Sequence, residues 1–350
     1  MDTAISEESY GLYVNFMRVN CVINTIMMAL ILFLIICHTP TKMATYKWYL
    51  MNMALSCYAL DLFNDLFFLP VTIFPIIGAC TLGLLKPFNT YATSFMQYFL
   101  GFCAASQTYA VIYRTASVYD KLHVLGRKSS IFLLLFIQLS YSIPAVIATL
   151  LTFPGHEKSV DYIKENYPLM LDFFLTHSCT ILGTEVSKII PYIVTALTLI
   201  WGVVMANMVA VTMAIRGLRA ARGKMTQKTY RMHRQLTLSV VLQTIIPTGM
   251  VTASYVTLVI ACVMQLDSAR TISFVAFVIS TFHTTVLGLL MIFIIRPYKL
   301  ALLTYIRRLM PIREPREDPN RRANRMVSPA KTNTLTAVHQ VKERPGTVSQ

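Results

Sequence analysis

Seven stretches of mostly apolar residues dominate this sequence, and each is long enough to cross a lipid bilayer as a helix. A helix needs about 20 such residues to span the hydrocarbon core. Apolar residues make up 55% of the chain and charged residues only 13%, a balance that is unusual for a soluble domain. The sequence therefore predicts an all-α membrane protein with a bundle of seven transmembrane helices. The stretches are residues 19–37, 48–77, 90–113, 131–153, 189–215, 236–266 and 272–295.

The distribution of basic residues predicts how this bundle is oriented. Cytoplasmic loops carry excess Lys and Arg, and the connections after the first, third and fifth stretches are the basic ones. The longest of them, residues 216–234, holds seven bases and no acid. The N-terminus begins with Asp2, Glu7 and Glu8. We therefore expect the N-terminus outside and the C-terminus in the cytoplasm, as an odd number of spans requires.

The pattern divides the chain into four segments. Residues 1–18 are predicted to form an extracellular N-terminus, and residues 19–298 the seven-helix transmembrane domain. Residues 299–310 combine regularly spaced leucines with Arg307 and Arg308, which predicts an amphipathic helix on the membrane surface. Residues 311–350 are rich in Arg, Pro, Asn and Thr, a composition that predicts a disordered cytoplasmic tail.

The net charge of +15 predicts an anionic binding partner, and the position of the basic residues indicates which kind. They lie in segments next to membrane helices, so we expect them to contact anionic lipid of the inner leaflet and no nucleic acid. No HExxH, GxSxG or Walker A sequence is present, so the sequence predicts neither an enzyme nor a cofactor. The cysteines lack the CxxC and Cys/His spacings of zinc and redox sites, so no metal site is predicted either.

Two cysteines are candidates for a disulfide. Cys80 lies near the outer end of the second stretch and Cys179 in the long outer connection, residues 154–188, so both face the oxidising side. Cys21 and Cys262 also lie near the outer surface, and spacing alone cannot fix the pairing. The long connection itself is either a lid over the bundle or a loosely ordered connector.

A few polar residues and prolines interrupt the apolar stretches. Asp61 and Asp65 are four residues apart, so they share one helix face, and that face must point into the bundle because lipid penalises a charge by about 2.5 kcal/mol or more. They form either a polar switch or cation site, or a hydrogen-bonded pair that holds helices together. Pro247 removes a helix hydrogen bond and is a candidate hinge. His283 either contacts a ligand or packs as a hydrogen-bonded core residue.

Several short motifs follow one another in the order found in a known receptor family. Together they resemble the nematode serpentine chemoreceptors, in the group that includes classes H and I. The motifs are Thr39-Pro40-Thr41-Lys42-Met43, Tyr46-Lys47 with Asp61, Phe74-Pro75 with Gly78 and Gly83, Gln243 followed by Ile246-Pro247, and Arg296-Pro297-Tyr298-Lys299.

The resemblance implies a chemosensory receptor of the G-protein-coupled type, in the plasma membrane of sensory neurons and their cilia. A small molecule would bind among the outer halves of spans three, five, six and seven, and a heterotrimeric G protein would bind at the cytoplasmic face. Arg114 at the inner end of span three is preceded by Tyr113, whereas these receptors often carry an acid or Asn there. Its resting state must therefore be held by another group. The residues expected to face the G protein are Arg114, Arg216, Arg219, Arg222, Arg231 and Arg234; those expected to act inside the membrane are Asp61, Asp65, Gln243 and Pro247.

A function from another class competes with this interpretation. The chain is alternatively a ligand-gated ion channel subunit with a seven-helix fold like that of insect odorant receptors. That class has its N-terminus in the cytoplasm, which is the opposite of the orientation that the charges predict here. A transporter is a third alternative, although Asp61 and Asp65 alone do not make a convincing substrate path.

Overall fold

The chain divides into two units, Met1–Leu303 and Thr304–Gln350. The computed structural model describes residues 7–41, 45–74, 76, 78–125, 127–184, 186–223, 226–264 and 268–309. The helical bundle belongs to the first unit.

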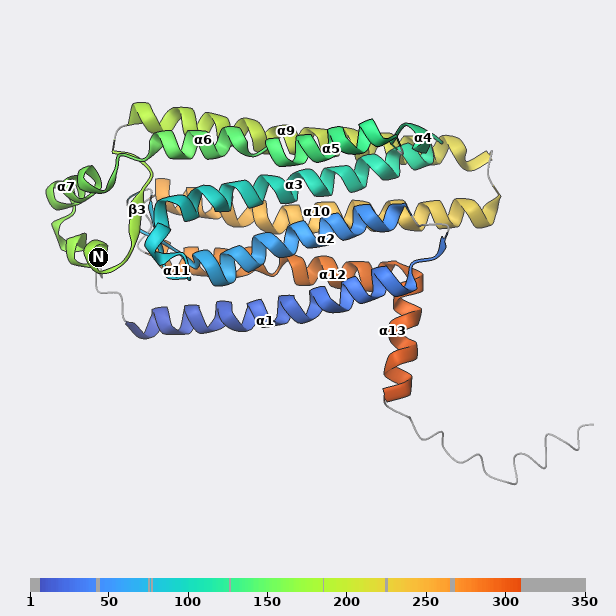
Figure 1. Ribbon diagram of the computed structural model, residues 1–350, viewed down its shortest axis with the longest axis horizontal. Helices are drawn as coiled ribbons and strands as arrows, with labels where there is room; N and C mark the ends of the chain where they lie inside the picture. Colours follow the sequence, from blue (N-terminus) through green and yellow to red (C-terminus); the bar gives the residue numbers. More distant parts are fainter. Residues whose placement is uncertain are drawn as a thin grey trace, which may run out of the picture. The chain divides into compact units, whose positions relative to one another are not determined.

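Long helices run side by side in the first unit (Figure 1). Its described residues form seven rods, one for each predicted span, and α3 is central because it packs against α2, α5, α6, α9 and α10. The all-α seven-helix fold is thereby confirmed. The rods are α1 (Glu7–His38), α2 (Tyr46–Leu62) with its π-helical extension η2 (Phe63–Phe68), α3 (Asn89–Val118), α5 (Lys128–Ser140) with α6 (Ile143–Thr152), α9 (Val186–Ala220), α10 (Gln227–Val263), and α11 (Ala269–Thr281) with α12 (His283–Ile294).

Five of the rods are by themselves long and apolar enough to cross a membrane, as judged over the described residues. They correspond to Gly11–His38, Lys128–Thr152, Ser187–Gly223, Thr229–Leu258 and Ala269–Ile294. The other two, α2 with η2 and α3, carry more polar side chains. Those side chains are buried in the bundle, where neighbouring helices rather than lipid surround them. A central position therefore explains why these two rods are less apolar.

The predicted end of the second span at residue 77 is wrong. The helix ends at Phe68, where Leu69 adopts a left-handed φ of 45° and donates its N–H to the Asn64 carbonyl oxygen at 3.0 Å. Pro70 follows, and a proline cannot continue the helical hydrogen-bond pattern. The apolar residues after it form a strand instead, so a continuous apolar run concealed a change from helix to strand.

Two spans that were predicted as continuous are broken. The fourth is divided between α5 and α6, and Pro144 lies in the first turn of α6, where its missing N–H has no helical partner to lose. The seventh is divided between α11 and α12 at Phe282, without a proline. Backbone groups that a break releases inside a membrane protein must find partners within the protein. The second break therefore requires side chains from other rods.

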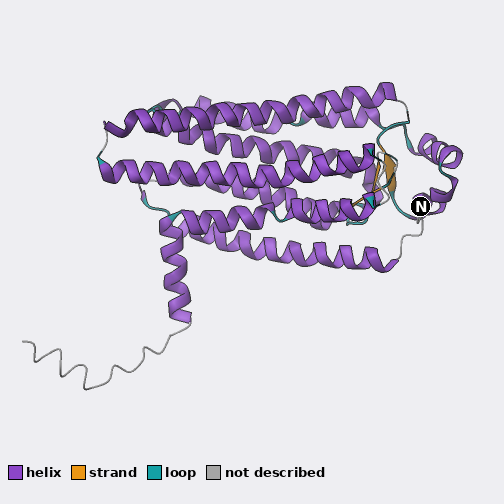
Figure 2. Ribbon diagram, turned by 180° about the vertical axis from the view of Figure 1, so that it is seen from behind, coloured by secondary structure: helices purple, strands orange, loops and turns teal. Residues whose placement is uncertain are grey.

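A three-stranded antiparallel sheet closes one end of the bundle, which we call the sheet end (Figure 2). Its order is β1 (Pro70–Thr72), β2 (Gly78–Thr81) and β3 (Cys179–Ile181). Cys80 and Cys179 are paired across β2 and β3, and a disulfide joins them. A Cβ atom on Gly78 would lie only 2.7 Å from the backbone oxygen of Thr180. Glycine is therefore needed there for the strands to approach each other.

The connection between α6 and α9 is folded over the sheet end. It contains α7 (His156–Asn166), η4 (Pro168–Met170), α8 (Leu171–Thr176) and β3. Ile163 and Phe174 from this connection are buried in a cluster with Tyr13 and Met17 of α1 and Phe277 of α11. The interpretation of this segment as a loosely ordered connector is therefore wrong for these residues. We call residues 156–181 the cap.

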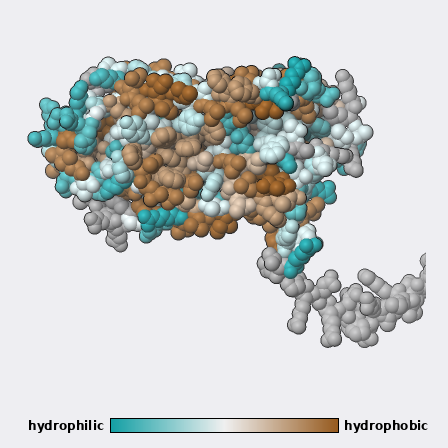
Figure 3. Space-filling view, in the orientation of Figure 1, coloured by the Kyte–Doolittle hydropathy of each residue, from teal (hydrophilic) through white to brown (hydrophobic). Residues whose placement is uncertain are grey.

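The flank of the bundle is apolar. On the face shown in Figure 3, hydrophobic side chains gather along the helices and hydrophilic ones toward the ends. Phe132 and Leu151 in the fourth rod are 73% and 76% exposed. Such a large exposed apolar surface would favour aggregation in water, whereas in lipid it matches its surroundings.

The end opposite the sheet carries the connection between α9 and α10, with the short helix η5 (Ala221–Gly223), and we call it the basic end. After α12 the chain forms α13 (Arg296–Leu309). This helix starts earlier than the predicted amphipathic helix at residues 299–310, and its position on a membrane stays a prediction. The predicted disordered tail at residues 311–350 lies outside the described residues.

Candidate functional site

Two carboxylates lie buried on the inward face of the second rod. Asp61 and Asp65 are 1% and 0% exposed. Asp65 Oδ2 accepts hydrogen bonds from Asn20 Nδ2 at 2.9 Å and Asn24 Nδ2 at 3.4 Å. Asp61 Oδ2 accepts from Asn24 Nδ2 at 3.4 Å and from the Thr284 backbone N–H at 3.3 Å. Donors from other rods thus reach both acids, as burial of a charged group requires.

The same side chains hold the break in the seventh rod. The Thr281 carbonyl, at the end of α11, accepts hydrogen bonds from Asn24 Nδ2 at 3.0 Å and Asn20 Nδ2 at 3.3 Å. The Thr284 N–H, at the start of α12, donates to Asp61. Helix ends leave such carbonyls and N–H groups without intrahelical partners. The first and second rods therefore supply the partners that the broken helix needs.

His283 extends this contact on the other side of Asp61. It is the first residue of α12 and is 1% exposed. Its Nδ1 lies 2.9 Å from Asp61 Oδ1 and 2.8 Å from the Ser280 carbonyl oxygen. Asp61 consequently contacts the start of α12 through both of its oxygens. The packing alternative considered for His283 is compatible with this arrangement, because its ring is enclosed by protein groups.

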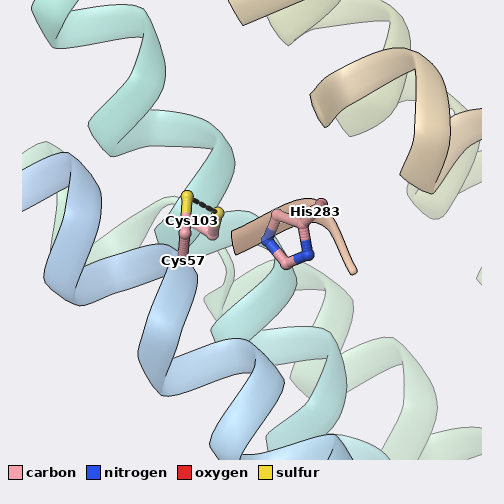
Figure 4. Close-up of side chains that lie close together, drawn as sticks. All are labelled: Cys57, Cys103 and His283. Carbon is pink, nitrogen blue, oxygen red and sulfur yellow. Dashed lines mark hydrogen bonds between the residues drawn. The ribbon is translucent and has the colours of Figure 1, made fainter. Parts of the chain in front are cut away.

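Polar contacts continue from His283 to α3 and α10. Cys57 on α2 and Cys103 on α3 lie beside the imidazole ring (Figure 4), with their sulfur atoms 3.0 Å apart. Gln107 Nε2 lies 3.4 Å from Cys57 Sγ and 3.6 Å from Cys103 Sγ. Gln107 Oε1 accepts a hydrogen bond of 2.9 Å from Thr248 Oγ1 on α10. Thr248 directly follows Pro247, so this chain of contacts ends at the candidate hinge.

These residues form one connected set, which we call the polar network. It joins α1, α2 with η2, α3, α10 and the broken seventh rod. Chemically it offers carboxylates, an imidazole and thiols that can hold a proton or a cation, and hydrogen bonds that can hold helices together. Its members are Asn20, Asn24, Cys57, Asp61, Asp65, Cys103, Gln107, Thr248, Thr281, His283 and Thr284.

Most members of the polar network were not singled out in the sequence, although a signal was present. Asn20 and Asn24, Cys57 and Asp61, and Cys103 and Gln107 are each four residues apart within apolar stretches. This spacing places each pair on one helix face. Which faces meet could not be read from the spacing, because it depends on the packing of the rods.

Arg114 lies at the other end of the bundle and is held by α10. It is 4% exposed. Its Nη2 donates to the His233 carbonyl oxygen at 2.8 Å, its Nε to Thr237 Oγ1 at 3.3 Å and its Nη1 to Ser117 Oγ at 3.4 Å. A carbonyl and hydroxyl groups thus take the place of the missing acid at position 113. In this conformation Arg114 is buried rather than presented at the surface.

The other predicted residues are distributed as follows. Gln243 is buried, and its Nε2 donates to Ser239 Oγ on the same helix at 2.9 Å, so it has no hydrogen bond to the polar network among the described residues. Pro247 lies inside the continuous helix α10. The five remaining bases are exposed near the junction of α9 and α10; they are Arg216, Arg219, Arg222, Arg231 and Arg234.

A shallow groove lies between α10 and α11. Its volume is about 280 Å³, which is just below the usual range for ligand pockets. Apolar side chains predominate, with hydroxyl groups among them. The lining residues are Ala253, Ser254, Thr257, Thr271, Ile272, Val275, Ala276 and Ile279.

Comparisons with known proteins agree with this architecture. A family model described as serpentine type 7TM GPCR chemoreceptor Srh matches residues 8–308. The crystal structure of squid rhodopsin is similar, with a TM-score of 0.50 and 12% sequence identity, over 93% of this chain and 94% of that chain. At this identity the likeness concerns the fold alone. No curated protein sequence matches the chain.

Proposed function

Because the chain belongs to the serpentine 7TM GPCR chemoreceptor Srh family, the nematode serpentine receptor class H, we propose that it detects a small, mainly apolar molecule and passes a conformational change to a heterotrimeric G protein at the basic end. The family is one of receptors rather than enzymes. The family and the rhodopsin-like fold support a chemosensory function of the G-protein-coupled receptor type, and no finding favours the ion-channel alternative.

The ligand class follows from the surfaces available near the sheet end. The cap and the sheet cover this end with buried apolar side chains such as Ile163 and Phe174. The groove between α10 and α11 is small and lined by Val275, Ile279 and similar residues. A molecule that fits there is compact and apolar, with at most a few polar groups to meet the hydroxyls. The groove supports binding between the outer halves of α10 and α11, and the family resemblance extends the proposed site to α3 and α9.

The transmission step uses the contact between Arg114 and α10. Arg114 is buried beneath α10 and bound to His233 and Thr237, which is the arrangement of a closed face. A ligand that binds better to a conformation in which this face is open will shift the population toward it. Opening would expose Arg114 beside the five exposed arginines at the junction of α9 and α10, where a G protein would bind. Pro247 is the proposed hinge.

The proposed orientation follows the charges. The N-terminus and the sheet end face outward, and the basic end faces the cytoplasm, where the arginines also contact anionic lipid. A disulfide between Cys80 and Cys179 supports this orientation, because disulfides persist on the oxidising side of a membrane. We place the receptor in the plasma membrane, including that of sensory cilia.

One experiment tests the proposal and its main alternative together. The full chain with an N-terminal tag is expressed in cells, and surface tag exposure, G-protein activation and membrane current are recorded against a panel of small apolar molecules. We expect an exposed tag and ligand-dependent G-protein activation. Ligand-dependent current without G-protein activation, with the tag inside the cell, would contradict the receptor hypothesis and support the ion-channel alternative.

A matched pair of variants tests the basic end. Replacing Arg216, Arg219, Arg222, Arg231 and Arg234 by Gln should reduce ligand-driven G-protein activation without reducing ligand binding. The control replaces the exposed Lys158 and Lys164 in the cap by Gln. These lysines lie at the opposite end of the bundle, so the control should leave G-protein activation unchanged. Equal activation by both variants at equal surface expression would contradict the proposed G-protein site.

A further inference from the structure

Three side chains with metal-binding atoms meet inside the bundle, although they are far apart in the sequence. Cys57 comes from α2, Cys103 from α3 and His283 from the start of α12 (Figure 4). They are 0%, 4% and 1% exposed. Their ligand atoms all lie within 4.8 Å of one another, and the two sulfur atoms are 3.0 Å apart. A single ion can therefore reach all three after small side-chain movements.

The imidazole has one nitrogen available for such an ion. Nδ1 of His283 is already in contact with Asp61 Oδ1 and the Ser280 carbonyl oxygen. Nε2 is buried and has no hydrogen-bond partner among the described residues. Leaving a buried polar atom without a partner is unfavourable, and a bond to a metal would offset this cost. A histidine that binds metal through one nitrogen usually has its other nitrogen held by a carboxylate or carbonyl, as Nδ1 is here.

The donor set selects the kind of metal. Calcium and magnesium prefer oxygen ligands, whereas thiolate sulfur favours soft ions such as Cu⁺ and Zn²⁺. Structural zinc sites take four ligands in a tetrahedron. Within the described residues the cluster has three donors, and Asp61 is turned toward Nδ1 rather than toward the sulfur atoms. A soft ion that accepts three ligands fits better, and Cu⁺ is such an ion.

We propose that Cys57 Sγ, Cys103 Sγ and His283 Nε2 bind one Cu⁺ ion. In the metal-free site both groups are thiols, and the proton of one of them lies in the contact between the two sulfur atoms. Cu⁺ takes the place of that proton, which leaves to solvent as the copper–thiolate bond forms, while the other sulfur keeps its proton and binds as a neutral donor together with His283 Nε2. One thiolate and Cu⁺ together are neutral, so the site adds no net charge to the membrane interior, where charge is costly. Gln107 Nε2, at 3.4 and 3.6 Å from the two sulfur atoms, stabilises the thiolate.

Copper at this position would join three rods. The ion would tie α2 and α3 to the broken seventh rod, and Asp61 would orient His283 as a positioning residue. This inference does not rest on the ligand or the G protein proposed above. It concerns metal binding alone, and its failure would leave the proposed function untouched.

The test measures Cu⁺ binding by the purified full-length receptor under reducing conditions. Cu⁺ is titrated in competition with a coloured Cu⁺ chelator, released protons are counted, and the copper X-ray absorption spectrum is recorded. We expect one copper per receptor, one proton released per copper, and two sulfur atoms and one nitrogen around the ion. Zn²⁺ should not displace the copper. A spectrum without sulfur ligands, or displacement by equimolar Zn²⁺, would overturn the proposal.

Variants assign the ligands. Cys57→Ala, Cys103→Ala and His283→Gln should each weaken Cu⁺ binding roughly 100-fold or more. Asp61→Asn should weaken it roughly 10–100-fold, as is usual when the hydrogen-bond partner of a metal-binding histidine is removed. The control variants are Cys21→Ala and Cys37→Ala, which remove free cysteines outside the cluster and should bind Cu⁺ like the parent.

Two further results would contradict the site. One is unchanged copper binding by Cys57→Ala. The other is a disulfide between Cys57 and Cys103 that persists under the reducing conditions of the titration, which peptide mapping would detect. Thermal unfolding of every copper-free variant identifies any that fail to fold, and the spectrum of the parent protein decides the case without them.

Discussion

Replacing Thr237 by Val tests whether the contact between Arg114 and α10 holds the receptor in its resting conformation. Thr237 Oγ1 accepts a hydrogen bond of 3.3 Å from Arg114 Nε, and Thr237 is 4% exposed. Hydrogen bonds to charged groups contribute about 1.5–3 kcal/mol, and the length of this one suggests the lower value. If the contact exists only in the closed state, its loss shifts the equilibrium toward the open state by about 1.5 kcal/mol, or roughly 10-fold.

The assay is ligand-independent G-protein activation in cells, normalised to surface expression. We expect Thr237→Val to raise basal activation by up to about 10-fold, because the open population is small in the resting receptor. Thr229→Val is the control, since Thr229 lies on the same helix and its hydroxyl contacts the Thr226 hydroxyl rather than Arg114. Basal activation that is equal in the two variants, with intact expression, would refute the closed-state role of this contact.

Three further variants test contacts that stabilise the fold of the bundle. Loss of the disulfide in Cys80→Ala with Cys179→Ala should lower the free energy of unfolding by about 4 kcal/mol, because the bond closes a separation of 99 residues; thermal unfolding of the single and double variants checks this. Asn24→Ala removes donors to Thr281 and both acids and should cost about 2–3 kcal/mol by the same measurement. Tyr298→Phe removes a 2.8 Å hydrogen bond to the Thr39 hydroxyl and should cost about 1 kcal/mol.

The cysteine and Asn24 variants each have a control that changes a nearby or similar side chain without removing the contact. Cys37→Ala removes an exposed free cysteine and should leave the melting temperature unchanged. Thr25→Val alters the exposed neighbour of Asn24 and should cost less than Asn24→Ala. A double cysteine variant as stable as its parent would argue against the disulfide, and equal melting temperatures for the Asn24 and Thr25 variants would argue against the role assigned to Asn24.

The number and class of the helices followed from the sequence because lipid imposes a simple rule. A span must be long and apolar whatever it packs against, so the seven stretches and the seven rods agree. The ends and interruptions did not follow. The strand after Phe68 is as apolar as a helix would be, and the break at Phe282 has no proline or glycine to announce it. Both depend on tertiary contacts, such as those of Asn20 and Asn24 with the Thr281 carbonyl.

The candidate site was accessible from the sequence only in part. Asp61 and Asp65 were evident because acids are costly inside a membrane. Cys57, Cys103 and Asn24 each have a polar partner four residues away on the same helix face, but this spacing could not show that the three residues belong to one group. Their importance arises from distances between rods, which spacing along one helix does not contain.

Helix α10 connects the two sites that the proposals treat separately. Thr248 bonds Gln107 of the polar network, and Thr237 and His233 of the same helix hold Arg114. Thr237 and Thr248 are eleven residues apart, or about 16 Å along a helix. Pro247 lies next to Thr248, the residue that bonds Gln107. Because Pro247 has no N–H, the carbonyl of Gln243 loses its helical donor, and bending is easiest there. His233 and Thr237 lie before this hinge and Thr248 lies directly after Pro247, so a change at the polar network that bends α10 at Pro247 must tilt the segment that holds Arg114 and alter its contact.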